Sequence, residues 1–244
     1  MNARITLAVA VRVLAQLRRD HRTLAMLLAV PTLLVALLWW MYEDSGPVFD
    51  RIGPALVALF PFVIMFLVTS VTTLRERSSG TLERLLAMPM GKLDFLLGYA
   101  IAFGLVAAVQ SALAVGVSVW LLDLEVVGPV WLLGVVAVAD AILGTALGLF
   151  VSAFAQTEFQ AVQFMPVVVI PQILLCGLMV GRDALPDVLH AVSDVLPLSY
   201  AVDAMQHLTR SSSTGEVWAD LAVVLAFVLG GLALGAATLR RRTP

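Results

Sequence analysis

The chain has 244 residues, of which 61% are hydrophobic and only 13% are charged, and its formal net charge is −2. Soluble globular proteins average about 45–50% apolar and about 25% charged residues, so this composition excludes a soluble domain and indicates a polytopic membrane protein. The single cysteine, Cys176, excludes a disulfide within the chain.

Residues 1–22 come first and predict a helix that lies in the membrane interface. On a helix Arg12, Gln16 and Arg19 share one polar stripe, and apolar residues occupy much of the remaining surface. Such a helix can lie flat while its arginines reach anionic headgroups. The alternative is a basic lead-in that only sets the orientation of the chain.

Six later segments are each long and apolar enough to cross a bilayer, which takes about 20 residues. We expect one all-α membrane domain over residues 1–244, with spans at about 23–41, 54–73, 97–122, 131–154, 159–180 and 218–239. Two of the connections are long, a segment at 75–89 and a loop at 181–217. Long connections in a chain of otherwise short loops often carry function.

The basic residues predict the orientation. Twelve of the fifteen lie in segments 1–22, 74–96 and 240–242, which six spans place on one side of the membrane. Because cytoplasmic loops are enriched in Lys and Arg, we expect a multi-pass protein of a bacterial or archaeal plasma membrane with both termini in the cytoplasm.

Motifs for catalysis and for cofactor binding are absent from the sequence. A phosphate-binding loop requires G-x-x-x-x-G-K-[ST], but Leu93 follows the only lysine, Lys92. The histidines lie in three different segments, without metal-ligand spacing. We therefore expect no catalytic, cofactor-binding or metal-binding residues, and we do not expect this chain to be an enzyme. A membrane enzyme that uses Asp140 is the competing hypothesis.

Polar residues inside the spans predict a candidate substrate path. Asp140 lies near the middle of the fourth span, where a charge is costly, so it should face the bundle interior, a partner subunit or water. The other candidates are Gln110, Thr145, Gln163 and Gln172. A hydrogen bond between helices is the alternative for each residue. For Asp140 both interpretations stay open, and for the other four the structural interpretation is favoured.

Two prolines, Pro166 and Pro171, interrupt the fifth span. A proline removes one backbone hydrogen bond and kinks a helix, so these residues are candidate hinges, although static kinks are more common. Secondary carriers often have paired broken helices in both halves. Here the two halves do not match, which argues against a carrier that works without an ATPase.

The segment at 75–89 contains a short helix-forming stretch. Ser and Gly at 78–80 are turn and cap residues, "TLERLL" follows, and Pro89 ends the stretch. Leu82, Leu85 and Leu86 share one face of such a helix. The helix either docks to a partner or lies on the membrane, and the physics alone does not choose between these two.

The stretch "RERSSGTLERLLAMPMGKLDFLLG" at 75–98 resembles the signature of ABC-2 type permeases, especially that of daunorubicin-resistance-like drug exporters. In the long outer loop Pro197, Leu198, Ser199 and Tyr200 resemble the P-L-T-Y element of that family. The chain departs from the pattern at Tyr99, where many relatives have Lys, and at Ser199, where Thr is more common.

The resemblance implies an ABC-2 or type V exporter-like fold, with an N-terminal interfacial helix, a cytoplasmic coupling helix between spans two and three, and short outer helices between spans five and six. It implies that separate ABC ATPase subunits bind ATP and Mg, that a second permease copy or a homologue completes a dimer, and that the lipid bilayer, and no nucleic acid, is the remaining partner. The cargo would be a drug-like or lipid-like amphipathic molecule, as in multidrug efflux and antibiotic resistance. Export of a polysaccharide or glycolipid is the alternative, and an ATPase-independent carrier is the less favoured one.

The resemblance also implies roles for two sets of residues. ATPase docking falls on the coupling helix, at Arg75, Glu76, Arg77, Gly80, Thr81, Leu82, Glu83, Arg84, Leu85 and Leu86. An outer gate falls on Pro197, Leu198, Ser199 and Tyr200.

Overall fold

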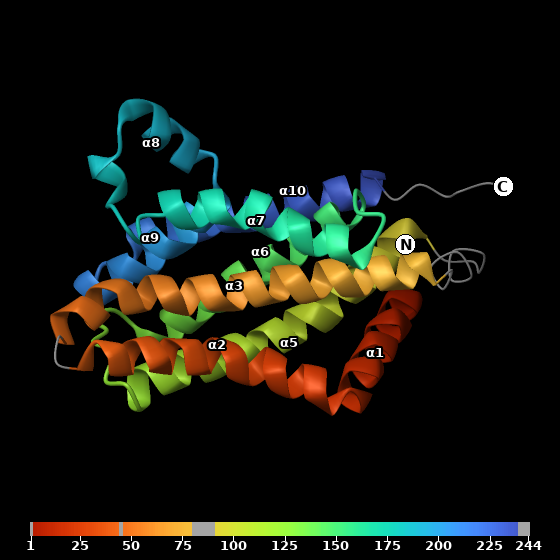
Figure 1. Cartoon of the computed structure of the whole chain (residues 1–244), viewed down its shortest axis with the longest axis horizontal. Coiled ribbons are helices and arrows are strands. Elements are labelled where there is room, and N and C mark those ends of the chain that lie inside the picture. The colour runs from red at the N-terminus through yellow and green to blue at the C-terminus, as the bar shows by residue number, and fades with distance from the viewer. Residues whose placement is uncertain (1, 44–45, 80–90, 239–244) are drawn as a thin grey trace.

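The computed structural model describes residues 2–43, 46–79 and 91–238, and every regular element in these ranges is a helix. Six of the described helices are long and apolar enough to cross a membrane, and they lie alongside one another in one bundle (Figure 1). They are α2 (His21–Met41), α3 (Gly46–Ser78), α5 (Lys92–Trp120), α6 (Val130–Ser152), α7 (Glu158–Leu175) and α10 (Gly215–Thr238). The predicted fold class, an all-α membrane protein with six spans, is confirmed.

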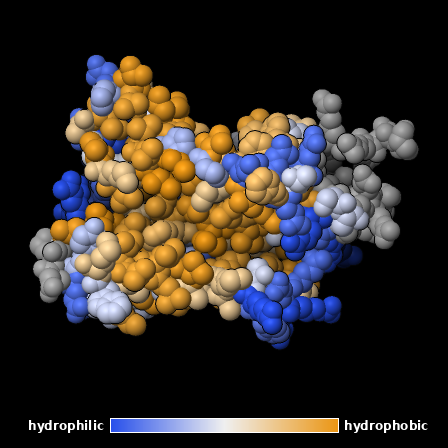
Figure 2. All heavy atoms as spheres, in the orientation of Figure 1, coloured by the Kyte–Doolittle hydropathy of each residue, from blue (hydrophilic) through white to orange (hydrophobic). Residues whose placement is uncertain are grey.

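The two ends of the bundle differ in chemistry. The tryptophans lie where α2 and α5 end and where α6 and α10 begin, which is one end of the bundle, here called the tryptophan end; they are Trp39, Trp40, Trp120, Trp131 and Trp218. Tryptophan is enriched at membrane–water interfaces. The opposite end, called the basic end, carries α1 (Ala3–Arg19), the end of α3 and the start of α5. Figure 2 shows a broad hydrophobic band between them.

Three spans differ clearly from their predicted bounds, and one of them is α5, which begins at Lys92, five residues before the predicted 97–122. α3 begins before the predicted 54–73 and ends after it, because its helix continues through Pro54 and extends to Ser78. α7 stops at Leu175, short of the predicted residue 180. The cause is Gly177, whose φ of +90° is a left-handed conformation that suits glycine and turns the chain away from the helix axis.

Helix α6 occupies the centre of the bundle and packs closely on α3. A Cβ atom added to Gly148 would lie 2.6 Å from the carbonyl oxygen of Phe66, and one added to Gly144 would collide with the carbonyl of Phe62. Only glycine permits this separation of the two backbones, as in other small-residue helix contacts in membranes.

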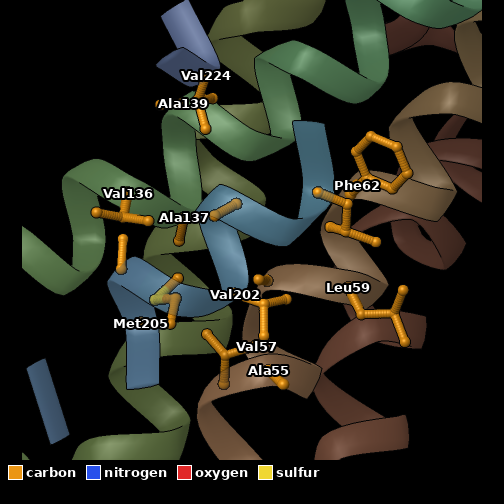
Figure 3. Packing of buried hydrophobic residues seen from close by; sticks show 14 of the residues in the cluster. Ala55, Val57, Leu59, Phe62, Val136, Ala137, Ala139, Val202, Met205 and Val224 are labelled. Carbon is orange, nitrogen blue, oxygen red and sulfur yellow. The ribbon is translucent and has the colours of Figure 1, made fainter. Parts of the chain in front are cut away.

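Between α7 and α10 the chain forms a short 3₁₀ helix η2 (Arg182–Ala184), α8 (Asp187–Asp194) and α9 (Pro197–Arg210). Helix α9 is inserted into the bundle and belongs to the core. Its Val202 and Met205 are fully buried and lie close to Ala137 of α6 (Figure 3). The backbone N–H of Gly128, in the α5–α6 connection, donates to the carbonyl of Leu208, so α9 is also fixed to that loop.

Helix α1 meets α2 at a sharp corner at the basic end (Figure 1). Its buried face includes Val9, Ala10 and Val13 and packs against α5. The closest approach is at Gly98, where an added Cβ would lie 2.6 Å from the Cβ of Val9. Gly98 is the last residue of the signature stretch, so the structure gives that glycine a packing role.

Candidate functional site

Helix α1 contacts the residues on both sides of segment 80–90, near the end of α3 and at the start of α5. Near the end of α3, Arg12 Nη2 donates to Glu76 Oε1 at 2.5 Å. At the start of α5, Asp94 Oδ1 accepts from the backbone N–H of Asn2 at 2.8 Å and from the hydroxyl of Thr6 at 3.2 Å. These five residues are called the basic-end clamp below, and they join α1, α3 and α5.

Local helix chemistry positions the residues of the clamp. Asn2 caps α1, because its side chain accepts from the backbone N–H of Arg4. Asp94 lies in the first turn of α5, where the helix dipole favours an acid, and its second oxygen accepts from the N–H of Gly91 at 3.0 Å. The N-terminal segment thus binds two acids, Glu76 near the end of α3 and Asp94 near the start of α5.

The polar stripe predicted on α1 contributes to the clamp. Arg12 is bound to Glu76, and Gln16 Nε2 lies 3.4 Å from the same Glu76 oxygen. The Glu76 side chain is only 11% exposed. Arg12 and Gln16 therefore face α3 in this structure, where the sequence predicted that such residues would face headgroups.

A second ion pair joins α3 to α7 at the basic end. Arg75 Nε and Nη2 donate to the two carboxylate oxygens of Glu158, each at 3.0 Å. Both side chains are largely exposed, at 67% and 48%. The last turns of α3 are therefore linked to α1 on one side and to α7 on the other.

Most of the predicted ATPase-docking residues lie outside the described residues. These are Gly80, Thr81, Leu82, Glu83, Arg84, Leu85 and Leu86. Arg75 and Glu76 lie at the end of α3 with the ion pairs given above, and Arg77 belongs to the same helix, although its side chain is also outside the description. A docking role for all ten stays a prediction.

At the tryptophan end, Arg182 is the centre of a network that joins four segments. Its guanidinium donates to Ser193 Oγ at 2.9 Å, to Asp194 Oδ1 at 2.5 Å and to Asp203 Oδ2, and it lies 5.2 Å from the centroid of the Tyr200 ring. Ser193 Oγ also donates to the carbonyl of the last residue of α7 at 2.8 Å. We call Arg182, Ser193, Asp194, Tyr200 and Asp203 the Arg182 hub.

Burial and charge act in opposite directions in the hub. Burial raises the pKa of Asp203, while the Arg182 guanidinium beside it opposes this rise. Burial acts to lower the pKa of Arg182, but the carboxylates of Asp203 and Asp194 outweigh burial and raise it. Arg182 therefore remains charged, and η2, α8 and α9 are held together around one largely buried cation.

The predicted outer-gate residues lie at and beside this hub. Pro197 begins α9, and both Leu198 and Ser199 are fully buried. Ser199 Oγ lies 3.0 Å from Ser193 Oγ, and the hydroxyl of Tyr200 donates to the carbonyl of Asp194 at 2.7 Å. Their role as a gate stays a prediction, and their position connects α9 to α8.

The predicted path residues have different environments. Thr145 Oγ1 donates to Ala141 of its own helix, and Gln172 bonds to Val168 of α7 and accepts from the N–H of Leu198. Gln163 is exposed on α7. Gln110 and Asp140 are fully buried, and in the described part of the chain neither side chain has a hydrogen-bond partner. Among the candidates, these two are the buried polar groups whose interactions are unexplained.

Pro166 and Pro171 are both exposed on α7, and the helix continues through them from Glu158 to Leu175. Their role as hinges stays a prediction. Within residues 2–43, 46–79 and 91–238, no group of three or more His, Cys, Asp or Glu side chains could hold a metal ion.

Sequence reasoning missed three residues that the structure shows to be central: Asp94, Glu158 and Arg182. Asp94 had a local signal, because an acid three residues after Gly91 and before an apolar run is typical of a helix start. Arg182 had a weaker signal, as one of three basic residues among many acids on the predicted outer side. Glu158 had none, because its partner Arg75 lies 83 residues earlier.

Comparison with known proteins adds the family to this geometry. The family model described as "ABC-2 type transporter" matches residues 5–209. The chain is 26% identical over 169 residues to the probable multidrug ABC transporter permease YbhR of Escherichia coli (strain K12), covering 69% of this chain and 46% of that protein. It is 27% identical over 184 residues to the inner membrane transport permease YhhJ of the same strain, covering 74% of this chain and 48% of that protein.

A third relative comes from a eukaryote. The ABC transporter G family member 20 of Dictyostelium discoideum is 25% identical over 183 residues, which cover 74% of this chain and 25% of that protein. In each of these three matches the aligned region spans half or less of the curated relative. Since the family model covers most of the chain, the chain belongs to the ABC-2 type transporter family of ABC transporter permeases.

Proposed function

We propose that this permease is the membrane subunit of an ATP-binding cassette exporter that moves a drug-like or lipid-like amphipathic molecule out of the cell. Separate ATPase subunits bind ATP and Mg and dock on residues 75–89. Two permease chains, identical or homologous, enclose the path. The observation that carries this proposal is the basic-end clamp, considered together with the family match.

The clamp supports coupling because of the place of its contacts. The segment 80–90 is flanked by Glu76 and Asp94, and α1 binds both residues. A partner that pushes on this segment therefore displaces α1 together with α3 and α5. The Arg75–Glu158 pair extends the same displacement to α7. Force from a docked ATPase would thus reach four helices.

In this proposal the basic end faces the cytoplasm and the tryptophan end faces outward, as the excess of basic residues at 1–22, 74–96 and 240–242 favours. The Arg182 hub then lies at the exit. Because α9 is inserted into the bundle and held by the hub, a release step requires α8 and α9 to shift together. We propose that Asp140 and Gln110, which are buried without hydrogen-bond partners among the described residues, line the substrate path.

The choice of cargo rests on composition and on relatives. Aromatic residues make up 8% of the chain and form no row of the kind that guides sugars. Two relatives from Escherichia coli, YbhR and YbhS, are named as probable multidrug ABC transporter permeases. Both observations favour an amphipathic small molecule over a polysaccharide or glycolipid, which remains the second candidate.

Co-purification tests the ATPase partner. A tagged chain purified from native membranes should retain a subunit with a phosphate-binding loop, identified by mass spectrometry. Glu83→Arg should abolish this retention without reducing the amount of permease in the membrane. The matched control is Glu125→Arg, which makes the same change at an exposed acid of the tryptophan end and should retain the partner. Normal retention in Glu83→Arg would remove this residue from the docking surface.

Transport in inverted membrane vesicles tests the cargo. Vesicles that contain the permease and its ATPase should accumulate a fluorescent amphipathic cation when ATP is added, and vesicles with Glu83→Arg should not. Accumulation of a labelled lipid-linked glycan in place of the dye would support the second candidate. In the same assay Asp140→Asn should lower the rate, and an unchanged rate would make Asp140 a structural residue.

A further inference from the structure

The corner between α1 and α2 carries a dense group of cations. The sequence from Arg18 to Arg22 reads "RRDHR", and all five side chains are exposed. Arg18 and Arg19 lie in the last turn of α1, and Arg22 lies in the first turn of α2. The chain thus presents three guanidinium groups at the point where an outlying helix turns into a membrane span.

The acid within this group is engaged elsewhere. Asp20 caps α2, since its Oδ1 accepts from the backbone N–H of Thr23 at 3.1 Å and its Oδ2 accepts from the Thr23 hydroxyl at 2.6 Å. The hydrogen bond from the Thr23 hydroxyl is the main reason that the pKa of Asp20 is lowered. Among the described residues no ion pair forms to Arg18, Arg19 or Arg22, so the corner keeps a net positive charge.

The exposed face of α1 next to the corner is apolar. Leu7 and Val11 are 56% and 64% exposed, and Arg18 follows Val11 by seven residues, which places all three on one side of the helix. On α2, one turn after Arg22, Met26 is 60% exposed. Figure 2 shows the hydrophilic patch at this corner directly beside the hydrophobic band. Apolar side chains at acyl depth and guanidinium groups at the border match an amphipathic ligand with an anionic head.

We propose that the α1–α2 corner is a binding site for anionic phospholipid headgroups, formed by Arg18, Arg19 and Arg22. The guanidinium groups bind the phosphate oxygens, and the exposed apolar face of α1 contacts the acyl chains. Of the two arginines in the predicted polar stripe of α1, Arg19 belongs to this site, whereas Arg12 is paired with Glu76 in the basic-end clamp. It rests on the placement of the spans in a membrane and does not require the ATPase.

Spin-labelled lipids test the site. The purified permease is reconstituted in phosphatidylcholine vesicles with a trace of spin-labelled phosphatidylglycerol or spin-labelled phosphatidylcholine, and electron paramagnetic resonance measures the immobilised fraction of each. The wild-type chain should prefer phosphatidylglycerol by about fivefold or more, which is what one basic residue near an anionic surface provides. High salt should reduce this preference, because the charges are exposed.

The variants R18Q/R22Q and R51Q/R210Q each remove two exposed arginines, the first from the corner and the second from the tryptophan end. The preference should be lost in the corner variant, and in R18Q/R19Q/R22Q, but kept in the control. Equal binding of both lipids by the wild type, or an equal loss in the corner variant and in the control, overturns the proposal. Either outcome leaves co-purification with the ATPase intact, so a failure here is distinguishable from a failure of the proposed function.

Discussion

The Arg182 hub and the basic-end clamp both hold outlying helices against the bundle, but they differ in how the contacts are distributed. The hub concentrates two ion pairs, a hydroxyl bond and an aromatic contact on one guanidinium that is only 12% exposed. The clamp divides its contacts between two acids about 18 residues apart in the chain, Glu76 and Asp94, each with its own donor from α1.

Because of this difference, we expect the hub to open or close as a unit and the clamp to allow gradual movement. When one buried cation holds several partners, its removal leaves more than one acid without a counter-charge, so the region opens or closes as a unit. When two independent contacts hold a helix, either can weaken while the other remains, so the helix can shift gradually with its neighbours. In the function proposed above, the hub would therefore act as a gate with two states, and the clamp would transmit displacement from a partner docked on residues 75–89.

The largest effect is expected from Arg182→Ala. It leaves Asp203 without a counter-charge and Asp194 with only His190 beside it, which should cost about 3 kcal/mol, the lower end for a broken buried ion pair because the two acids are 35% and 46% exposed. Thermal unfolding in detergent measures the loss. The control is Arg210→Ala, an exposed cation of the same end with no ion pair among the described residues, which should change stability by less than about 0.5 kcal/mol. Equal losses in the two variants would show that the contacts of Arg182 contribute no more to stability than an exposed cation does.

A smaller loss is expected where α1 packs on α5. Gly98→Val introduces a side chain where even a Cβ would lie 2.6 Å from Val9 and 2.9 Å from the carbonyl of Thr6. Overpacking of this kind costs about 1–3 kcal/mol, and it should be relieved by displacement of α1. A cysteine that replaces Val13, which is buried, should therefore become reactive toward a thiol reagent in the Gly98→Val variant. Gly181→Val is the control, because nothing lies within 4 Å of its added Cβ. If the cysteine at position 13 stays unreactive, α1 accommodates the larger side chain and remains packed against α5.

Hydrophobic runs predicted the six spans because membrane insertion depends on local composition. The bounds were less accurate where a backbone conformation ends a helix, as at Gly177, or where a helix continues through proline, as at Pro54. The signature stretch pointed to the correct family, but the contacts of its flanks depend on residues far away, such as Arg12 with Glu76 and Asn2 with Asp94. Pairs of this kind have no local pattern, so a single sequence cannot predict them.

The clamp predicts a charge-swap result. Arg12→Glu places two acids at the α1–α3 contact, and the loss of this partly buried pair should cost about 1 kcal/mol, or about fivefold in the coupled equilibrium. Stimulation of the partner ATPase by the permease should fall by that factor. The double variant Arg12→Glu/Glu76→Arg should restore it. If the double variant is no better than the single one, the ion pair does not carry the coupling.

The smallest effect is expected at the Arg75–Glu158 pair, which links α3 to α7. Its two-bond geometry is good, but both side chains are largely exposed, and exposed pairs contribute about 0.2–1 kcal/mol. A double-mutant cycle with Arg75→Gln and Glu158→Gln should therefore give an interaction energy below about 1 kcal/mol that disappears in high salt. A larger, salt-resistant value would mean that the pair is shielded from solvent in the assembled transporter. The contact of α3 with α7 would then be as strong as its contact with α1.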